Sequence, residues 1–281
     1  MKQLTCLLLV TLAVFQTACS QFWLAGSSQE NVSSSLVNYL YPDGMKTPVV
    51  PSTPLLQLPL RVGIAFVPGS GALAGSLNAA TRQKLLATVA DHFKQREYIS
   101  DIEVIPDAYL AGGKGFDTLE RVAGLYGLDI IALVSYDQQS FTADTKASFW
   151  YWTIVGAYVV EGSKNDVSTF VDTAVFDIPT QSLLMRAPGT SQLSGKSTAV
   201  DVAENLAQNR VRGFEEAMQD MTANLSVELD QLQARVEAGE ASELQVAHRP
   251  GYSGGGGGGG DLLLLGGLLL AGLLNGRQGR Q

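Results

Sequence analysis

The sequence predicts an α/β domain with a small mixed sheet, a long helix after it, and a C-terminal tail of glycine and leucine. Two observations predict the sheet. Strand-like apolar runs alternate with helical patterns through residues 60–136, and longer strand-like runs follow. A third observation, a regular apolar stripe within residues 198–236, predicts the helix. The expected order is strand, helix, strand, helix, strand and then a β-hairpin, with the helix and tail behind it.

The first part of the domain is predicted from alternating periodicities. Short apolar runs bounded by turn residues indicate strands, and apolar residues three and four apart indicate helices. The expected elements are a strand at Leu60–Val67, a helix capped by Asn78 that reaches Phe93, a strand at Ile102–Ile105, a helix at Phe116–Tyr126 and a strand at Ile130–Tyr136. This alternation favours a sheet covered by helices, with a parallel component from the crossovers.

The second part of the domain is predicted to be a hairpin. Two strand-like runs, Phe149–Val160 and Val167–Ile178, flank a turn at Glu161–Asp166, in which Gly162 and Asn165 favour turn conformations. A further strand is expected at Leu183–Ala187. The paired aromatic residues of the first run are expected to fill the core, or to form a binding platform if one face stays exposed.

A long helix is expected from Thr198 to Val236, with Thr198 and Asp201 spaced like a capping box. Its apolar stripe consists of Phe214, Met218, Met221, Leu225, Leu229, Leu232 and Val236. Gly213 is expected to weaken the helix and to permit a bend. Two arrangements remain open: the whole stripe packs on the domain, or the C-terminal half projects towards a partner.

The N-terminal residues have the pattern of a secretory signal. Lys2 precedes a mostly apolar run from Leu4 to Phe15, and small residues lead to Cys19. A cysteine after Ala18 at the end of such a segment resembles the lipobox of bacterial lipoproteins, although Gln16 stands where that family prefers leucine. The resemblance implies cleavage between Ala18 and Cys19 and acylation of Cys19 with chains such as palmitate. The alternative is an ordinary signal peptide cut near Ala18.

The C-terminal residues combine three features in a fixed order. A run of glycine is followed by an almost pure Leu/Gly segment, Leu262–Leu274, and then by Arg277 and Arg280. The run consists of Gly254, Gly255, Gly256, Gly257, Gly258, Gly259 and Gly260. Glycine favours an extended, accessible linker, and the leucine segment is short for a membrane crossing. The arginines are expected to stay on the cytoplasmic side.

This arrangement resembles the GlyGly-type C-terminal sorting tail that rhombosortase, a rhomboid-like intramembrane serine protease, removes. Together with Cys19, the tail resembles that of the rhombotarget lipoprotein family. The resemblance covers about a tenth of the chain and implies that the glycine run, Arg277 and Arg280 form the protease recognition tail. The alternative for the tail is a permanent C-terminal anchor. The element order of residues 60–195 also resembles small α/β domains of envelope lipoproteins that assist secretion or cell-wall synthesis.

The expected organisation therefore has six segments. They are a signal peptide at 1–18, a Pro/Ser-rich tether at 19–59, the α/β domain at 60–195, the long helix at 196–240, a flexible linker at 241–260 and the sorting tail at 261–281. Serine after Cys19 suggests transport to the outer membrane by the same resemblance, so the expected location is the cell envelope, lipid-anchored, at the outer membrane or cell surface.

Composition argues against several functions. The formal net charge is −8 and no basic cluster occurs, so a nucleic-acid partner is not expected. His92 and His248 are the two histidines, which leaves little material for a zinc site or a catalytic triad. Gly195, Lys196 and Ser197 lack the earlier glycine of a phosphate-binding loop. We expect no cofactor and no metal.

Carboxylates near strand ends are the remaining candidates for acid–base chemistry. They are Asp129, Asp137, Asp144, Asp172 and Asp177, and loose acidic residues are usually solvated. The leading hypothesis is therefore a noncatalytic envelope lipoprotein whose body binds another, unknown envelope protein. Its other expected partners are the acylation and signal-cleavage enzymes, rhombosortase, and the membrane through the lipid. The alternatives are a cell-wall or surface hydrolase and a companion substrate of a tail-cutting protease.

Overall fold

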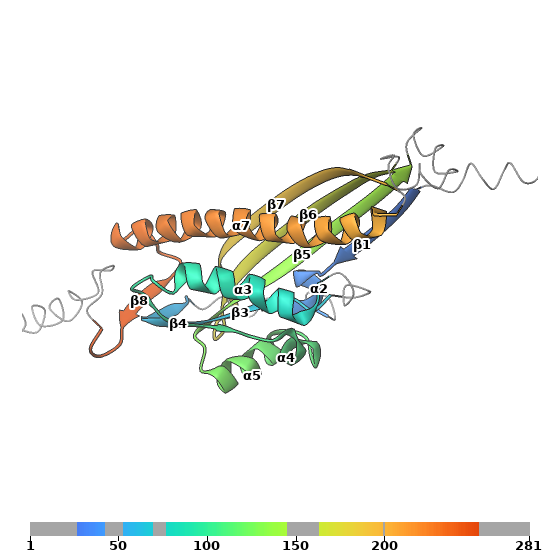
Figure 1. Ribbon diagram of the computed structural model, residues 1–281. Helices are drawn as coiled ribbons and strands as arrows, with labels where there is room; N and C mark the ends of the chain where they lie inside the picture. Colours follow the sequence, from blue (N-terminus) through green and yellow to red (C-terminus); the bar gives the residue numbers. More distant parts are fainter. Residues whose placement is uncertain (1–26, 43–52, 70–76, 145–162, 199, 253–281) are drawn as a thin grey trace, which may run out of the picture. The chain divides into compact units, whose positions relative to one another are not determined.

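Figure 1 shows the computed structural model of the chain, which describes residues 27–42, 53–69, 77–144, 163–198 and 200–252. The strands are β1 (Ser27–Ser33), β2 (Leu55–Leu58), β3 (Leu60–Phe66), β4 (Ile99–Val104), β5 (Ile130–Asp144), β6 (Ser163–Asp177), β7 (Ser182–Ser197) and β8 (Gln245–His248). The helices are α2 (Leu36–Leu40), α3 (Ala79–Phe93), α4 (Asp107–Ala111), α5 (Phe116–Tyr126) and α7 (Val202–Glu237). The predicted α/β class is confirmed.

The strands form two sheets, and the described chain divides into two compact units. The larger sheet has the order β4-β3-β5-β6-β7 with β1 beside β5, and the smaller one pairs β2 with β8. The first unit comprises residues 27–32, 137–144, 163–170, 190–198 and 200–216. The second unit comprises residues 33–42, 53–69, 77–136, 171–189 and 217–252.

Three parallel strands form the centre of the second unit. β3 pairs with β4 on one side and with β5 on the other, and both pairings are parallel. Parallel neighbours need crossover connections, which α3 supplies between β3 and β4 and the helices α4 and α5 supply between β4 and β5. Because helices cover both faces, the residues of β3 are almost continuously apolar and buried.

The two faces of this sheet pack against different helices. Ala65 and Val67 share one core cluster with Leu119 and Val122 of α5. The residues that alternate with Ala65 along β3 point to the opposite face, where α3 packs against β3 and β4. Figure 1 shows α3 on one side of these strands and α4 with α5 on the other. The crossover helices therefore build a three-layered second unit.

Helix α3 begins as its sequence predicts. The Asn78 side chain accepts a hydrogen bond from the Thr81 N–H at 2.8 Å, which satisfies one of the free donors of the first turn. Its buried residues are Leu85, Leu86, Val89, Ala90 and Phe93, which include the apolar residues at helical spacing that predicted this helix. The cap and the stripe together fix where the helix starts and which side faces the sheet.

The first unit is held together by polar contacts between its strands and α7. Gln138 of β5 donates to the Thr169 hydroxyl at 2.8 Å and to the Arg210 carbonyl oxygen at 2.9 Å. Arg210 in turn donates to the Ser140 hydroxyl at 3.0 Å and forms an ion pair with Glu30 of β1. These bonds link three strands and the helix through groups that are buried or half-buried, apart from the exposed Glu30.

The C-terminal half of α7 packs within the second unit and does not project. Met221 and Leu225 are buried, and Thr173 of β6 contacts the Met221 sulfur at 3.1 Å. Further along, Arg96 pairs with Asp230 at 2.6 Å. The helix also continues through Gly213 without a break. Of the two arrangements that the sequence left open, the structure therefore has the packed one.

The predicted hairpin is placed differently in the structure. Its first strand, Phe149–Val160, lies outside the described residues. The second part of the predicted turn at Glu161–Asp166 is wrong, because β6 begins at Ser163. Asn165, expected to favour a turn, is fully buried in this strand and donates a hydrogen bond to the Ser197 hydroxyl at 2.7 Å. The hairpin that the structure shows joins β6 to β7 through the turn after Asp177. β7 extends to Ser197, ten residues beyond the predicted end at Ala187.

The predicted linkers on either side of the domain also contain structure. Within the tether at 19–59, the structure forms β1, α2 and β2, and Tyr39 and Leu40 of α2 are buried. Within the linker at 241–260, Leu244 is buried and β8 pairs in parallel with β2. Composition was misleading here, because a few apolar residues among serines and prolines are enough to form a strand when a distant part of the chain supplies its partner.

Candidate functional site

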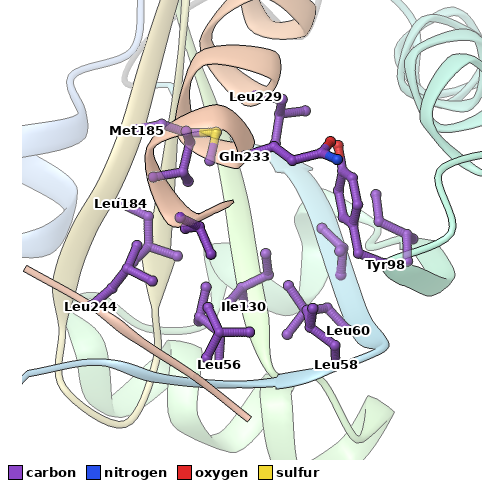
Figure 2. A pocket seen from close by; sticks show the side chains of 15 residues that line it. Leu56, Leu58, Leu60, Tyr98, Ile130, Leu184, Met185, Leu229, Gln233 and Leu244 are labelled. Carbon is purple, nitrogen blue, oxygen red and sulfur yellow. The ribbon is translucent and has the colours of Figure 1, made fainter. Parts of the chain in front are cut away.

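An apolar pocket in the second unit is the candidate functional site. It encloses about 100 Å³ and is lined by fifteen residues. Figure 2 shows their side chains converging from the strands of both sheets and from α7. Concave, mostly apolar cavities with few polar groups are the usual form of ligand sites in proteins.

The floor of the pocket is the end of the parallel sheet. Leu60 and Val62 of β3 point to the same face because side chains two apart share a face. Ile130, the first residue of β5, is the register partner of Val62, and Ile99, the first residue of β4, is the register partner of Leu60. These residues belong to the face that α3 covers further along the strands.

One wall of the pocket is the last part of α7. Leu229, Leu232 and Val236 line it at steps of three and four residues, the spacing that places side chains on one side of a helix. Earlier members of the same stripe, from Met218 to Leu225, are buried against the unit. The pocket therefore forms at the C-terminal end of α7, where the apolar stripe lines a cavity and is no longer packed as tightly as from Met218 to Leu225.

The opposite wall is the two-stranded sheet together with the start of β7. Leu56 and Leu58 are the two buried residues of β2, and Leu56 is the register partner of Val246 in β8. Val246 and Leu244, which directly precedes β8, line the pocket, and Leu184 and Met185 of β7 close the remaining side. Residues almost two hundred positions apart thus build one apolar surface.

The lining has two polar side chains, Tyr98 and Gln233. Figure 2 shows the Gln233 side chain extended towards the hydroxyl end of Tyr98. Burial raises the pKa of Tyr98, and its hydroxyl has no hydrogen-bond partner among the described residues. The lining holds no carboxylate, histidine, cysteine or serine. Such a surface can bind an apolar group and orient one polar group, and it has no nucleophile with a neighbouring base.

The described chain ends beside this pocket. The Arg249 N–H donates to the Leu58 carbonyl oxygen at 2.9 Å, directly after the β8 residue that pairs with Leu58. The Arg249 guanidinium also pairs with Asp129 at 2.7 Å, and the Tyr252 N–H donates to the Arg249 carbonyl oxygen at 3.1 Å. These backbone hydrogen bonds therefore hold residues 249–252 next to Leu58, which lines the pocket.

The site residues predicted from the sequence lie outside the described residues. This holds for Ala18 and Cys19 at the N-terminus, and for Gly254–Gly260, Arg277 and Arg280 at the C-terminus. The aromatic run from Phe149 to Tyr158 lies outside them as well. These remain predictions.

Three of the candidate carboxylates, Asp129, Asp172 and Asp177, are engaged in structural contacts. Asp129 accepts from the Arg61 N–H at 2.8 Å, and Asp172 is buried and pairs with Arg186 at 2.8 Å. Asp177 is buried and accepts from the Thr180 N–H at 3.0 Å in the β6–β7 turn. The expectation that these acidic groups are loosely solvated is wrong for Asp172 and Asp177.

The histidines do not form a site in the described structure. His92 is exposed on α3, where it contacts the Phe93 ring. His248 is the last residue of β8 rather than part of a flexible linker, and it is also exposed. Among the described residues, no group of three His, Cys, Asp or Glu side chains is placed to hold a metal ion.

The sequence prediction missed the pocket, although one signal for it was present. Apolar residues alternate along 56, 58, 60 and 62, a period of two that is typical of strands with one buried face. Pro59 between them, after a cis peptide bond, separates β2 from β3. No short-range signal shows that β8 would pair with β2.

Comparisons with known proteins give weak likenesses. No family model and no curated protein matches the chain. Among solved structures, a point variant of the PelC dodecamer from Paraburkholderia phytofirmans is 11% identical over 68% of this chain and 99% of its own, with a TM-score of 0.25. A putative neuraminyllactose-binding hemagglutinin homolog from Helicobacter pylori is 10% identical over 66% and 96%, with a TM-score of 0.35.

A third structure, lipoprotein GNA1162 from Neisseria meningitidis, is 10% identical over 57% of this chain and 96% of its own, with a TM-score of 0.24. Likenesses at these TM-scores carry no argument about what this chain does. Among the helices of the described residues, none has the length and apolar character needed to span a membrane.

Proposed function

We propose that the chain is a lipoprotein of the bacterial cell envelope, acylated at Cys19, whose tail is removed by rhombosortase and whose body is a noncatalytic binding module. The order of features at the two ends supports the first part. A basic, apolar, small-residue sequence precedes Cys19, and a glycine run, a leucine segment and two arginines follow the body.

The pocket is the observation that carries the second part of the proposal. Its lining offers thirteen apolar side chains and two polar ones, and buried apolar area is the main source of affinity in such sites. The partner we propose is an envelope protein that inserts apolar side chains into the pocket. Transport to the outer membrane, suggested by Ser20, belongs to the same proposal.

A hydrolase of the cell wall or surface is the alternative. It would need a rigid acid–base pair or an activated nucleophile next to a cavity. Asp172 and Asp177 are the buried carboxylates of the described body, and each is engaged by its own structural partner. This arrangement favours the binding module.

Intact-mass analysis of the protein purified from membranes tests the proposed processing. The expected species begins at Cys19, carries the mass of its acyl chains, and has lost the residues that follow the glycine run. A mature chain that keeps Arg277, or that carries no acyl mass, would contradict the proposal.

Crosslinking in cells tests the proposed role of the body. Leu232→Asp places a charge in the pocket wall and should abolish the pattern of crosslinked partners, because burying an unpaired charge is costly. Val227→Asp on the exposed side of the same helix and Asp137→Asn on β5 should keep the pattern. A pattern that survives Leu232→Asp but is lost in Asp137→Asn would favour the hydrolase.

A further inference from the structure

The leucine segment of the C-terminal tail follows the last pocket-lining residues closely in the sequence. Leu244 and Val246, before and within β8, belong to the pocket lining, and the described chain ends four residues after β8, at Tyr252. The Arg249 and Tyr252 backbone contacts fix this end next to Leu58, itself a lining residue. Whatever follows Tyr252 therefore leaves the body beside the pocket.

We propose that side chains from Leu262–Leu265, the first four residues of the leucine segment, fill this pocket in the uncut chain. The inference rests on the proposed function only in treating the tail as a segment that is later removed. The seating itself requires neither acylation of Cys19 nor cleavage by rhombosortase.

The connecting residues are long enough for this contact. Nine residues, 253–261, separate Tyr252 from Leu262, and seven of them are glycine. A fully extended chain of this length spans about 30 Å, and a glycine-rich coil has an average end-to-end distance of about 17 Å. The width of the pocket wall is smaller, because β2 has four residues and a strand rises about 3.3 Å per residue.

The chemistry of the segment matches the lining. Leu262 to Leu265 are four successive leucines, and the pocket is walled by leucine, isoleucine, valine and methionine. A cavity of about 100 Å³ suits one or two such side chains, since an engineered cavity of about 150 Å³ accommodates benzene. The pocket is thus sized for part of the segment rather than for a whole helix.

Because the tail is covalently connected to the body, even a weak contact between the leucines and the pocket is enough to keep the pocket occupied. A short linker holds the segment at an effective concentration in the millimolar range, so seating needs little intrinsic affinity. A separate partner must compete with that concentration. Seating therefore keeps the pocket filled until the tail is removed, and cleavage after the glycine run vacates the pocket for the partner.

Photo-crosslinking of the full chain in cells that lack rhombosortase tests the seating. A photoreactive phenylalanine replaces Leu264, and the crosslinked peptides are identified by mass spectrometry after irradiation. The expected products join the tail to peptides that contain Leu232 of α7 or Leu244 before β8. The same group in place of Gln278, beyond the leucine segment, should give few such products.

Matched substitutions establish that the pocket is responsible. Leu232→Asp should lower the yield of these products about tenfold or more, whereas Val227→Asp, exposed on the same helix, should leave the yield unchanged. Products from the Leu264 probe that involve lipids or other proteins alone would overturn the proposal. Equal yields in the two aspartate variants would overturn it as well.

A second experiment leaves the lining almost intact. Leu232→Cys introduces a thiol in the pocket, and its rate of maleimide labelling reports access. Labelling should be about tenfold slower with the natural tail than in a chain whose four leucines, 262–265, are replaced by serine. Equal rates would overturn the seating. Because the uncut chain is used, failure here is distinct from failure of the proposed processing, which intact mass reports.

Discussion

Single residues decide how closely α7 approaches the strands. In the second unit, a Cβ added at Gly189 of β7 would press on the Ala217 carbonyl oxygen and lie 2.5 Å from the Met221 nitrogen. In the first unit, a Cβ at Gly213 of α7 would lie 2.7 Å from the Thr169 hydroxyl. Gly213, which the sequence suggested as a weak point in the helix, serves close packing instead.

Gly189→Ala is expected to destabilise the fold by about 1–3 kcal/mol, because backbone atoms of α7 cannot move aside as a side chain can. Chemical denaturation of the purified protein measures the loss. Gly112→Ala is the matched control, since a Cβ there meets nothing within 4 Å. Equal stabilities of the two variants would contradict the close approach of β7 and α7.

Two buried tyrosines make the free energy of unfolding decrease at alkaline pH. Burial raises the pKa of Tyr39 and of Tyr136 from 10.0 to about 12. The folded state therefore holds these protons more tightly than the unfolded state. Their contribution to stability is complete below pH 10 and is lost as the pH rises through about 12.

The unfolding free energy should accordingly fall between about pH 10 and pH 12, and Tyr136→Phe should make the fall shallower. Urea titrations at several pH values measure the slope. Tyr41→Phe, at an exposed position directly after α2, serves as the control. If the fall in unfolding free energy with pH is the same in Tyr136→Phe as in the natural protein, the pKa of Tyr136 is not raised by burial.

At the scale of elements, α7 contributes one long apolar stripe to the packing of the described residues. Its stripe is buried from Phe214 to Leu225 and then lines the pocket from Leu229 to Val236. Phe214 is completely inaccessible, and Val227, on the other side of the helix, is 53% exposed. One periodic stripe therefore supplies first a packed core and then a binding wall.

Phe214→Ala is expected to cost about 3–5 kcal/mol, because it removes buried surface and leaves a cavity. Val227→Ala should change stability by about 0.5 kcal/mol or less. Thermal or urea unfolding followed by circular dichroism measures both variants. A small effect of Phe214→Ala would mean that α7 is not fixed in the packing that the structure shows.

Local signals predicted most of the elements between residues 60 and 136. The Asn78 cap, the α3 face and the bounds of α5 follow from capping and periodicity, which act within a few residues. The length of β7 and the β2–β8 pairing do not follow. They depend on partners far away in the sequence, so Leu56 and Leu244 look like linker residues until both strands are in place.

At the scale of the whole molecule, the proposed function joins the folded body to two processed ends. The sequence supplied the candidate residues at the ends, because signal and tail patterns are local. It did not supply the pocket, because strands of both sheets and a helix contribute to it. The candidate binding site is therefore a tertiary feature, and the candidate processing sites are sequence features.

Cys19→Ser separates the two interpretations of the signal. If Cys19 is the acylated residue of a lipobox, the serine variant should accumulate as an uncut precursor, because lipoprotein processing requires the thiol. An ordinary signal peptide would still be cut near Ala18. Immunoblotting and N-terminal sequencing distinguish these outcomes, and Cys6→Ser, inside the apolar segment, should be processed normally.

The parallel pairing of β2 with β8 has a consequence for the order in which the body is completed. Leu55 is opposite Gln245, and a ribosome makes β2 about 190 positions before β8. During that interval Leu56 and Leu58 have no neighbouring strand, and the cavity lacks the side that Leu244 and Val246 provide. A nascent or truncated chain that stops before Leu244 cannot complete the pocket, so only bodies that include β8 are competent to hold an apolar guest.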